Sequence, residues 1–267
     1  MQITPVGSNL SAPRNRARIG EAWIDSITCA EALDAIEHLV TSRAGGFVVT
    51  PNIDHVVNLD RDPGLRQAYE AATLALVDGQ PLVWASRLLG TPLPEKISGA
   101  DLVPLLMQRA ALRHWRVYLV GAGPGVAQEA AEKIARTGVE IVGSDAPSLS
   151  PRVDASEFVD VTERIRTARA DLVLVAFGSP KQELWMLRAR DQIRPAVSIG
   201  VGATLDFIAG RVRRAPAWMS RCGLEWLFRL AHEPRRLWRR YLVNDPRFLL
   251  ILIRTLRMPR AERIRLL

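Results

Sequence analysis

Residues 116–125 read Arg116-Val-Tyr-Leu-Val-Gly-Ala-Gly-Pro-Gly125, a short apolar run that leads into a glycine-rich turn. A helical pattern follows from residue 125 to residue 137. Strand, turn and helix in this order form the repeating unit of a parallel sheet. The apolar run has little polar alternation, which is typical of a strand covered on both faces. This stretch therefore predicts an α/β fold.

The same unit recurs along the chain up to Gly210. Strands are predicted at 22–24, 46–49, 74–77, 116–120, 140–142, 172–176 and 197–200. Helices are predicted at 30–43, 64–72, 80–89, 99–112, 125–137, 156–168 and 181–189. Beyond Gly210 no further strand is predicted, and helices are expected at 218–230, 234–242 and 247–256.

These elements predict a Rossmann-like, mostly parallel sheet with helices on both faces, followed by a helical appendage rich in Arg and Trp. Three parts are expected: an N-terminal extension (1–20), an α/β domain (21–210) and a C-terminal helical appendage (211–267).

The composition is that of a globular protein. Of 267 residues, 48% are hydrophobic and 24% are charged, which excludes disordered, collagen-like and coiled-coil chains. The two Cys and four His show neither the spacing of a redox pair nor that of a metal site. We therefore predict no metal site, no disulfide framework and no bound cofactor.

Positive charge is concentrated in the appendage. The whole chain carries a net charge of +8, whereas residues 211–267, with 15 Arg and four acidic residues, carry +11. Such asymmetry predicts contact with an anionic partner, whether phosphates, nucleic acid or lipid headgroups.

No segment reads as a secretory signal or a membrane span. Residues 1–18 lack an apolar core behind a basic start, and the apolar run 248–253 ends at Arg254, far short of the ~20 residues that cross a bilayer. We expect a cytoplasmic protein that contacts the inner face of the plasma membrane peripherally. The oligomeric state is left open, a homo-oligomer included.

Polar side chains follow two of the predicted strands where they end. Thr50, Asn52 and Asp54 follow the strand at 46–49, and Asp78 follows the strand at 74–77. In open parallel sheets this edge is where ligands bind. A carboxylate there can serve as a general base. The alternative is that Asn52, Thr50 and Asp78 only cap the helices that follow.

The glycine-rich turn is a candidate phosphate site. Gly121, Gly123 and Gly125 precede a helix, whose N-terminal N–H groups attract anions. The spacing is not that of a regular dinucleotide motif, and the acid expected at the end of the next strand is missing, since Glu140 opens that strand instead. An NAD-dependent oxidoreductase remains as an alternative function.

Two further strand ends carry polar groups. The first offers Gly178, Lys181, Gln182 and Glu183, and the second leads to Asp206. These side chains suit phosphate or sugar hydroxyls, and the alternative is an ordinary helix start. Four polar strand ends at one edge predict a binding site.

Arg and Trp alternate in the appendage, for example at Trp218, Trp226 and Trp238. Such helices suit an anionic membrane interface. A non-catalytic, Arg-rich nucleic-acid-binding protein is the alternative, but no RNP-like motif, zinc finger or helix-turn-helix supports it, and no nucleic acid is predicted as a partner. A third interpretation gives some Arg to an active site, where they neutralise a leaving diphosphate.

Taken in order, these motifs resemble the WecG/TagA/CpsF glycosyltransferase family over about residues 20–245. The residues that carry the resemblance are Thr50-Pro-Asn-x-Asp, Asp78-Gly79, Lys96-Ile-Ser-Gly-Ala-Asp101-Leu, Gly121-Ala-Gly-Pro-Gly125, Gly178-Ser-Pro-Lys-Gln-Glu183, Gly200-Val-Gly-Ala-x-x-Asp206, Arg214-Ala-Pro-x-Trp218, Gly223-Leu-Glu-Trp-Leu-x-Arg-Leu and Glu233-Pro-x-Arg236.

The resemblance implies an inverting, metal-independent transferase that moves a sugar from a UDP-sugar to a polyprenyl-diphosphate-linked sugar in cell-surface polysaccharide synthesis. N-acetylmannosamine, its uronic acid and glucose all fall within the donor range that it implies. It also implies that Asp78 is the base and that Thr50 flanks the reaction centre.

The resemblance further assigns binding roles. Substrate contacts are implied for Asn52, Asp54, Lys96, Ser98, Asp101, Gly121, Gly123, Gly125, Gly178, Lys181, Gln182, Glu183 and Asp206. Contacts to the lipid diphosphate are implied for Arg214, Arg221, Arg229 and Arg236. The chain departs from the family pattern at Lys96, where many relatives have Arg, and at Val77, where Pro is common.

Overall fold

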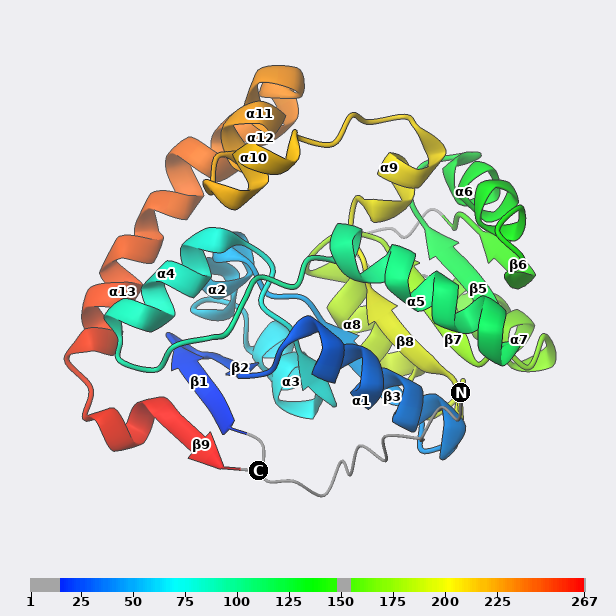
Figure 1. Ribbon diagram of the computed structural model, residues 1–267, viewed down its shortest axis with the longest axis horizontal. Coiled ribbons are helices and arrows are strands. Elements are labelled where there is room, and N and C mark those ends of the chain that lie inside the picture. The colour runs from blue at the N-terminus through cyan, green and yellow to red at the C-terminus, as the bar shows by residue number, and fades with distance from the viewer. Residues whose placement is uncertain (1–14, 148–154, 267) are drawn as a thin grey trace, which may run out of the picture.

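The computed structural model describes residues 15–147 and 155–266, and a parallel sheet of six strands forms its centre (Figure 1). The strands lie in the order β4 (Leu74–Ala75), β3 (Gly46–Val49), β8 (Val197–Gly200), β7 (Leu172–Ala176), β5 (Arg116–Gly121) and β6 (Glu140–Asp145). Every neighbouring pair is parallel. The predicted α/β fold is confirmed.

Helices cover both faces of this sheet, as predicted. One buried cluster is built from the sheet and from α1 (Cys29–Thr41), α5 (Gly99–Arg113), α6 (Val126–Ala135) and α9 (Thr204–Ala209). The cluster on the other face includes α2 (Ile53–Leu59), α3 (Pro63–Ala71), α4 (Gln80–Leu88), α7 (Ala155–Thr167) and α8 (Lys181–Ala189).

Two of these helices, α2 and α9, are absent from the sequence prediction. They contain seven and six residues, about two turns each, which is too short to display a helical period in the sequence. Both begin just after a strand of the sheet and lie at its carboxyl edge. They therefore shape the region where the polar strand ends gather.

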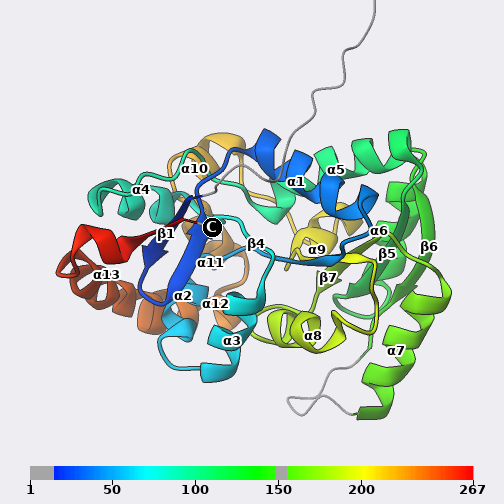
Figure 2. The same cartoon turned by 90° about the horizontal axis from the view of Figure 1, so that it is seen from below.

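A second, antiparallel sheet joins the two ends of the described chain (Figure 2). Its central strand, β1 (Asn15–Ile19), pairs with β2 (Ala22–Asp25) on one side and with β9 (Ile264–Leu266) on the other. The strand predicted at 22–24 therefore exists, but it lies outside the parallel sheet.

The prediction of no strand after Gly210 is wrong. β9 is three exposed residues long and becomes a strand only because it completes the edge of β1, a partner almost the whole chain away. The predicted N-terminal extension also contains β1, while residues 1–14 lie outside the described residues.

Between α9 and residue 263 the chain forms a series of short helices joined by turns. It runs through α10 (Ala217–Arg221), α11 (Glu225–His232), α12 (Pro234–Arg239), a π-helical turn η1 (Arg240–Asn244), a short 3-10 turn η2 (Asp245–Arg247), α13 (Phe248–Leu256) and a second 3-10 turn η3 (Arg260–Arg263). Within the described residues, no helix has the length and hydropathy needed to cross a bilayer.

The last helix is part of the core. In α13, Phe248, Ile251 and Thr255 are buried, and the helix packs against α2 and β1. The backbone N–H of Gly20 donates a hydrogen bond to the Thr255 hydroxyl at 3.0 Å. The chain therefore leaves the parallel sheet after α9 and crosses above its edge as the segment from α10 to η2, the crossing helices. It then reaches α13, which lies beside α2 and the antiparallel sheet (Figure 1).

Candidate active site

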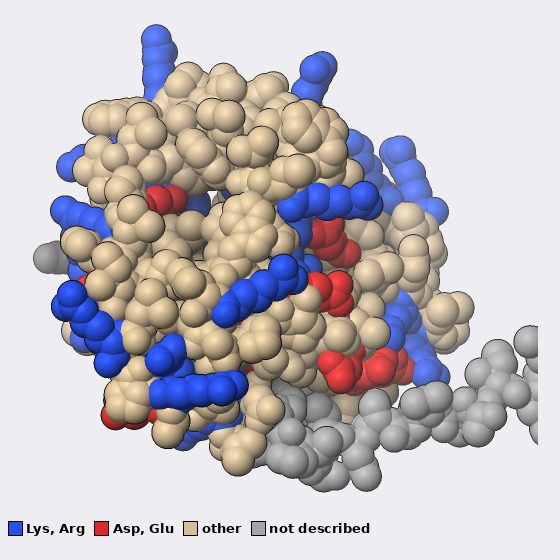
Figure 3. Space-filling model, turned by 60° about the vertical axis from the view of Figure 1, so that its left-hand side comes forward, with Lys and Arg blue, Asp and Glu red and all other residues tan. Residues whose placement is uncertain are grey.

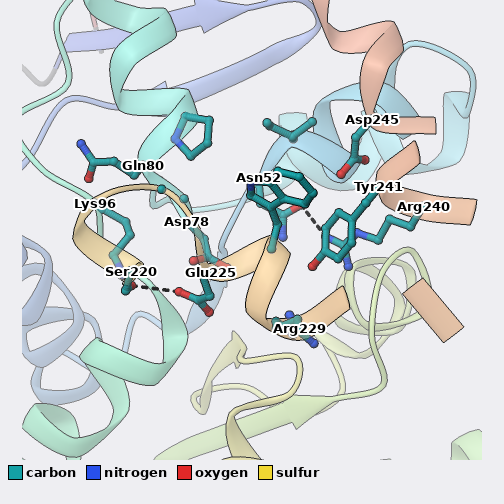
Figure 4. Close-up of a pocket in the computed structure, with 15 residues that line it drawn as sticks. Asn52, Asp78, Gln80, Lys96, Ser220, Glu225, Arg229, Arg240, Tyr241 and Asp245 are labelled. Atoms are coloured by element: carbon teal, nitrogen blue, oxygen red, sulfur yellow. Dashed lines mark hydrogen bonds between the residues drawn. The ribbon is translucent and has the colours of Figure 1, made fainter. Parts of the chain in front are cut away.

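A cavity of about 220 Å³ lies between the carboxyl edge of the sheet and the crossing helices. Figure 4 shows Asp78, Lys96, Ser220 and Glu225 toward one end, Arg240 and its neighbours at the other, and Asn52 between them. The full lining is Asn52, Ile53, Asp78, Gly79, Gln80, Pro81, Lys96, Ser220, Gly223, Glu225, Trp226, Arg229, Arg240, Tyr241 and Asp245.

Asp78 is held at the cavity because backbone hydrogen bonds continue beyond the end of β4. Its backbone N–H donates to the carbonyl of Pro51 at 2.7 Å, and the carbonyl of Val77 accepts from Ile97 N–H at 2.7 Å. Gly79 then turns the chain at φ +127°, a value that disfavours other residues, and α4 begins. The backbone is therefore fixed both before Asp78, by these hydrogen bonds, and after it, by the turn at Gly79.

The carboxyl group of Asp78 is poised to exchange a proton near neutral pH. Burial raises its pKa to about 7, and the nearby carboxylate of Glu225 adds to this rise, while Lys96 and Arg229 oppose it. A carboxyl with this pKa is half ionised near pH 7 and can accept a proton from a bound hydroxyl group. Asp245, whose pKa burial also raises to about 7, lines the same cavity, so two of its carboxyl groups titrate near neutral pH.

Thr50 and Asn52 have different surroundings. Thr50 is buried outside the cavity lining, and its hydroxyl donates to the carbonyl of Gly200 at 2.9 Å, which ties β3 to the end of β8. Asn52 lines the cavity and caps α2, accepting a hydrogen bond from His55 N–H. Asp54 is in the first turn of α2, and its carboxylate pairs with Arg240 at 3.4 Å.

Lys96, Ser98, Asp101 and Arg214 form one cluster, of which only Lys96 lines the cavity. The Asp101 carboxylate pairs with Lys96 at 2.9 Å and also with Arg214, and it accepts from the Ser98 hydroxyl at 2.6 Å. Burial alone would raise the pKa of Asp101, but these hydrogen bonds lower it to about 2. Asp101 is therefore a permanent anion that holds Lys96 at the cavity wall.

The glycine-rich turn lies outside the cavity lining. Gly121 has φ +101°, and a Cβ there would stand 2.7 Å from the carbonyl carbon of Ala176, so this glycine allows β5 and β7 to approach closely. Gly125 occupies the N-cap position of α6, and Gly123 sits between the two. Phosphate binding by this turn remains a prediction.

The strand end after β7 is also outside the cavity. Gln182 and Glu183 are buried, and the Gln182 carboxamide donates to Glu183 at 2.7 Å and accepts from Gly202 N–H at 3.2 Å. Burial raises the pKa of Glu183 to about 7. The contact of Gln182 with Gly202 joins α8 to the loop after β8, and Glu183 holds the Gln182 carboxamide from within α8.

The remaining predicted residues also lie away from the cavity lining. Gly178 and Lys181 are at the start of α8, and Asp206 is in α9, where burial raises its pKa. Within the described residues, no group of three or more His, Cys, Asp and Glu side chains could hold a metal ion.

Among the four predicted arginines of the appendage, only Arg229 lines the cavity. Arg236 pairs with Glu233 at 2.6 Å, Arg214 pairs with Asp101, and Arg221 is exposed. Within the described chain Arg229 has no acidic partner at ion-pair distance, and its guanidinium lies 6.0 Å from the ring of Phe207. Arg229 therefore keeps a positive charge available to an anion in the cavity.

Sequence reasoning missed most of the cavity lining. Next to the sheet edge it missed Ile53, Gly79, Gln80 and Pro81, and in the segment that crosses above the edge it missed Ser220, Gly223, Glu225, Trp226, Arg240, Tyr241 and Asp245. Nothing in the sequence separates them from neighbours that face solvent. The break in the helical pattern around Asn244-Asp245-Pro246 is the one local signal, because it accompanies the π-helical turn η1.

Two comparisons with known proteins agree with the resemblance. The family model described as "Glycosyl transferase WecG/TagA/CpsF family" matches residues 17–262. A protein of Bacillus spizizenii named N-acetylglucosaminyldiphosphoundecaprenol N-acetyl-beta-D-mannosaminyltransferase is 34% identical over 220 residues, which covers 80% of this chain and 82% of that protein. The chain therefore belongs to the WecG/TagA/CpsF family and is a glycosyltransferase.

Proposed function

We propose that the chain transfers N-acetylmannosamine from its UDP-sugar to N-acetylglucosamine carried on a polyprenyl diphosphate, with inversion at the anomeric carbon and without a metal ion. The name of the Bacillus relative supports the choice of sugar and acceptor. The observation that carries the proposal is the Asp78 carboxyl, with a pKa of about 7, in a cavity that also presents the unpaired Arg229.

The cavity supplies both halves of an inverting displacement. Asp78 takes the proton of the acceptor hydroxyl, whose oxygen bonds to the anomeric carbon as the bond from that carbon to UDP breaks. The electron pair of the broken bond stays on UDP. Arg229 and Lys96 place positive charge in the cavity, where it stabilises the diphosphates of donor and acceptor.

A donor panel tests this function. The protein is incubated with a short-chain polyprenyl-diphosphate N-acetylglucosamine and, separately, with the UDP-sugars of N-acetylmannosamine, its uronic acid and glucose, with a metal chelator present. We expect a product with N-acetylmannosamine, and NMR of the product reports the anomeric configuration. Transfer from none of the three donors would overturn the proposal. Calorimetry with UDP, NADH and a short RNA separates the two alternative functions.

The pH dependence of kcat/KM should follow Asp78. The carboxyl is protonated below its pKa of about 7 and cannot act as a base, so kcat/KM should fall as the pH drops through 7, to about one tenth of its plateau at pH 6. Asp245, whose pKa burial also raises to about 7, lines the same cavity. The acidic limb should therefore persist in Asp245→Asn, and a flat profile between pH 5.5 and 8 would contradict the assignment.

We further propose that the protein binds the inner face of the plasma membrane through the residues beyond 211 and the neighbouring α4. Large apolar side chains are exposed on α13 and on α4, and both helices lie at the same end of the molecule in Figures 1 and 2. They include Trp84, Leu88, Leu249, Leu250, Ile253 and Leu256. Figure 3 shows this side as a broad uncharged surface with Lys and Arg around it.

Charged substitutions on α13 test the membrane proposal. The Leu250→Glu/Ile253→Glu variant should reduce flotation with anionic liposomes at least about tenfold, because each leucine-sized side chain gains roughly 1.5–3 kcal/mol on burial. Leu112→Glu, which places a carboxylate at an exposed leucine of α5, is the control. Salt should also weaken binding, since charges are screened beyond ~8 Å at physiological ionic strength. Flotation equal to that of the control would contradict the proposal.

A further inference from the structure

We propose that Arg240 is a positioning residue that fixes the carboxamide of Asn52, so that the amide NH₂ group faces the cavity and donates a hydrogen bond to an oxygen of a substrate sugar. The oxygen belongs to a hydroxyl or an acetamido carbonyl group. The identity of the substrate rests on the proposed function, whereas the contact between the two side chains is a property of the free protein.

The orientation of the amide follows from its hydrogen bonds. The Asn52 Oδ1 atom accepts one from the backbone N–H of His55 at 3.3 Å and another from Arg240 Nη2 at 3.1 Å (Figure 4). A carbonyl oxygen has two lone pairs, so both are used. A flipped amide would place its NH₂ group against two donors, which excludes the other orientation.

The NH₂ group is consequently left for a ligand. Asn52 lines the cavity, and within the described chain no acceptor lies at hydrogen-bond distance from its Nδ2 atom. Because the Asn52 NH₂ group is already oriented before substrate binds, it can donate a hydrogen bond to a sugar oxygen without the cost of ordering a side chain, and it favours substrates that have an oxygen at that position. The amide is therefore a feature of the binding site in addition to its role as the cap of α2.

Arg240 is itself held from several sides. Its Nε atom pairs with Asp54 Oδ2 at 3.4 Å, and its guanidinium lies 5.3 Å from the ring of Tyr241. The half-buried Asp245 lines the same cavity, and the charge of Arg240 counters the rise in its pKa. The positive charge of Arg240 thus has a carboxylate, that of Asp54, at ion-pair distance, whereas within the described residues Arg229 has none so close. We therefore assign the diphosphate to Arg229 and the positioning of Asn52 to Arg240.

The contact couples the crossing helices to the sheet edge. Arg240 and Asn52 are 188 residues apart, and Arg240 begins the π-helical turn that also places Tyr241 at the cavity. π-Helical turns occur frequently at functional sites. The crossing helices consequently orient the Asn52 carboxamide, and they also contribute cavity residues of their own, such as Arg229 and Tyr241.

The side-chain amide signal of Asn52 tests the contact without any substrate. In ¹⁵N-resolved NMR spectra of the free protein, Arg240→Ala should shift the two Asn52 NH₂ resonances, whereas Arg239→Ala, which removes an exposed neighbouring guanidinium, should not. Arg240→Lys retains a donor and should restore most of the wild-type position. Resonances that are unchanged in Arg240→Ala would overturn the inference whatever the protein catalyses.

Steady-state kinetics tests the role of the NH₂ group. Asn52→Asp keeps the oxygen that caps α2 and accepts from Arg240 but replaces the NH₂ group, so the melting temperature should hold while KM rises about tenfold for one substrate. Separate titrations of donor and acceptor show which sugar the amide contacts. A wild-type KM for both substrates would exclude the donor role.

A double-mutant cycle decides whether Arg240 acts through Asn52. If it does, Asn52→Ala and Arg240→Ala each raise KM, and the double variant is no worse than Asn52→Ala alone. Effects that multiply would mean that Arg240 binds substrate directly, which overturns the positioning role. Absence of any transfer by the wild-type protein would refute the proposed function and leave the NMR test intact.

Discussion

Asp78→Asn is expected to lower kcat by about 10²- to 10⁴-fold, the usual contribution of a general base. The amide has the size and shape of the carboxyl group but cannot accept the proton of the acceptor hydroxyl. The change is expected to leave the fold intact, because Asp78 is anchored through its backbone N–H to Pro51. Single-turnover measurements with saturating donor report the chemical step directly.

Two measurements accompany this prediction. Calorimetry should show UDP binding to Asp78→Asn within a small factor of that to the wild type, since the substitution removes a base and leaves Arg229 and Lys96 in place. Asp245→Asn, a carboxyl-to-amide change in the same cavity, should cost much less. Turnover by Asp78→Asn close to that of the wild type would refute the assignment of the base.

Asp25→Ala is expected to lower the free energy of unfolding by about 3–5 kcal/mol, because it leaves a buried guanidinium without its anion. Asp25 is 1% exposed, and its carboxylate accepts from Arg16 Nε at 3.0 Å, from Arg16 Nη2 at 3.2 Å and from Ala75 N–H at 2.7 Å. This group therefore connects β1 and β2 to β4 of the parallel sheet. Urea denaturation followed by circular dichroism measures the loss.

The double variant Arg16→Met/Asp25→Ala separates two contributions to the loss of stability: the loss of the ion pair itself and the burial of an unpaired guanidinium. It carries no uncompensated guanidinium, so it should be more stable than Asp25→Ala, although Ala75 N–H still lacks an acceptor. A loss below 1 kcal/mol in Asp25→Ala would mean that Arg16 finds another partner or reaches water. In that case the pair would not determine how the small sheet docks.

The parallel sheet was predictable from the sequence because its strands are locally distinct. Runs such as 172–176 are apolar on every residue and buried on both faces, and the turns after them contain Gly, Pro or Asn. The position of Asp78 at the sheet edge follows from the same pattern. Asn52 was also indicated: it caps α2, as one interpretation held, and it lines the cavity, while its contact with a substrate stays a prediction.

The composition of the cavity was not predictable in the same way. Half of its wall comes from residues 220–245, which reach Asp78 and Asn52 only after the chain has completed the sheet. Charge and aromatic content mark the whole of that segment, so they do not separate Arg229, which faces the cavity, from Arg221, which faces solvent. Ion pairs such as Lys96 with Asp101 likewise depend on the fold, and they decide which cations remain available.

The pairing of β9 with β1 has a consequence for shortened forms of the protein. The crossing helices follow α9, and after them the chain is anchored to the rest of the protein by α13 and by the pairing of β9 with β1. Trimming from the C-terminus removes this anchor before it reaches any residue of the cavity wall. Inactivity of such a shortened protein would therefore show that the crossing helices have lost their C-terminal anchor. Single-residue substitutions are needed to learn what each arginine contributes.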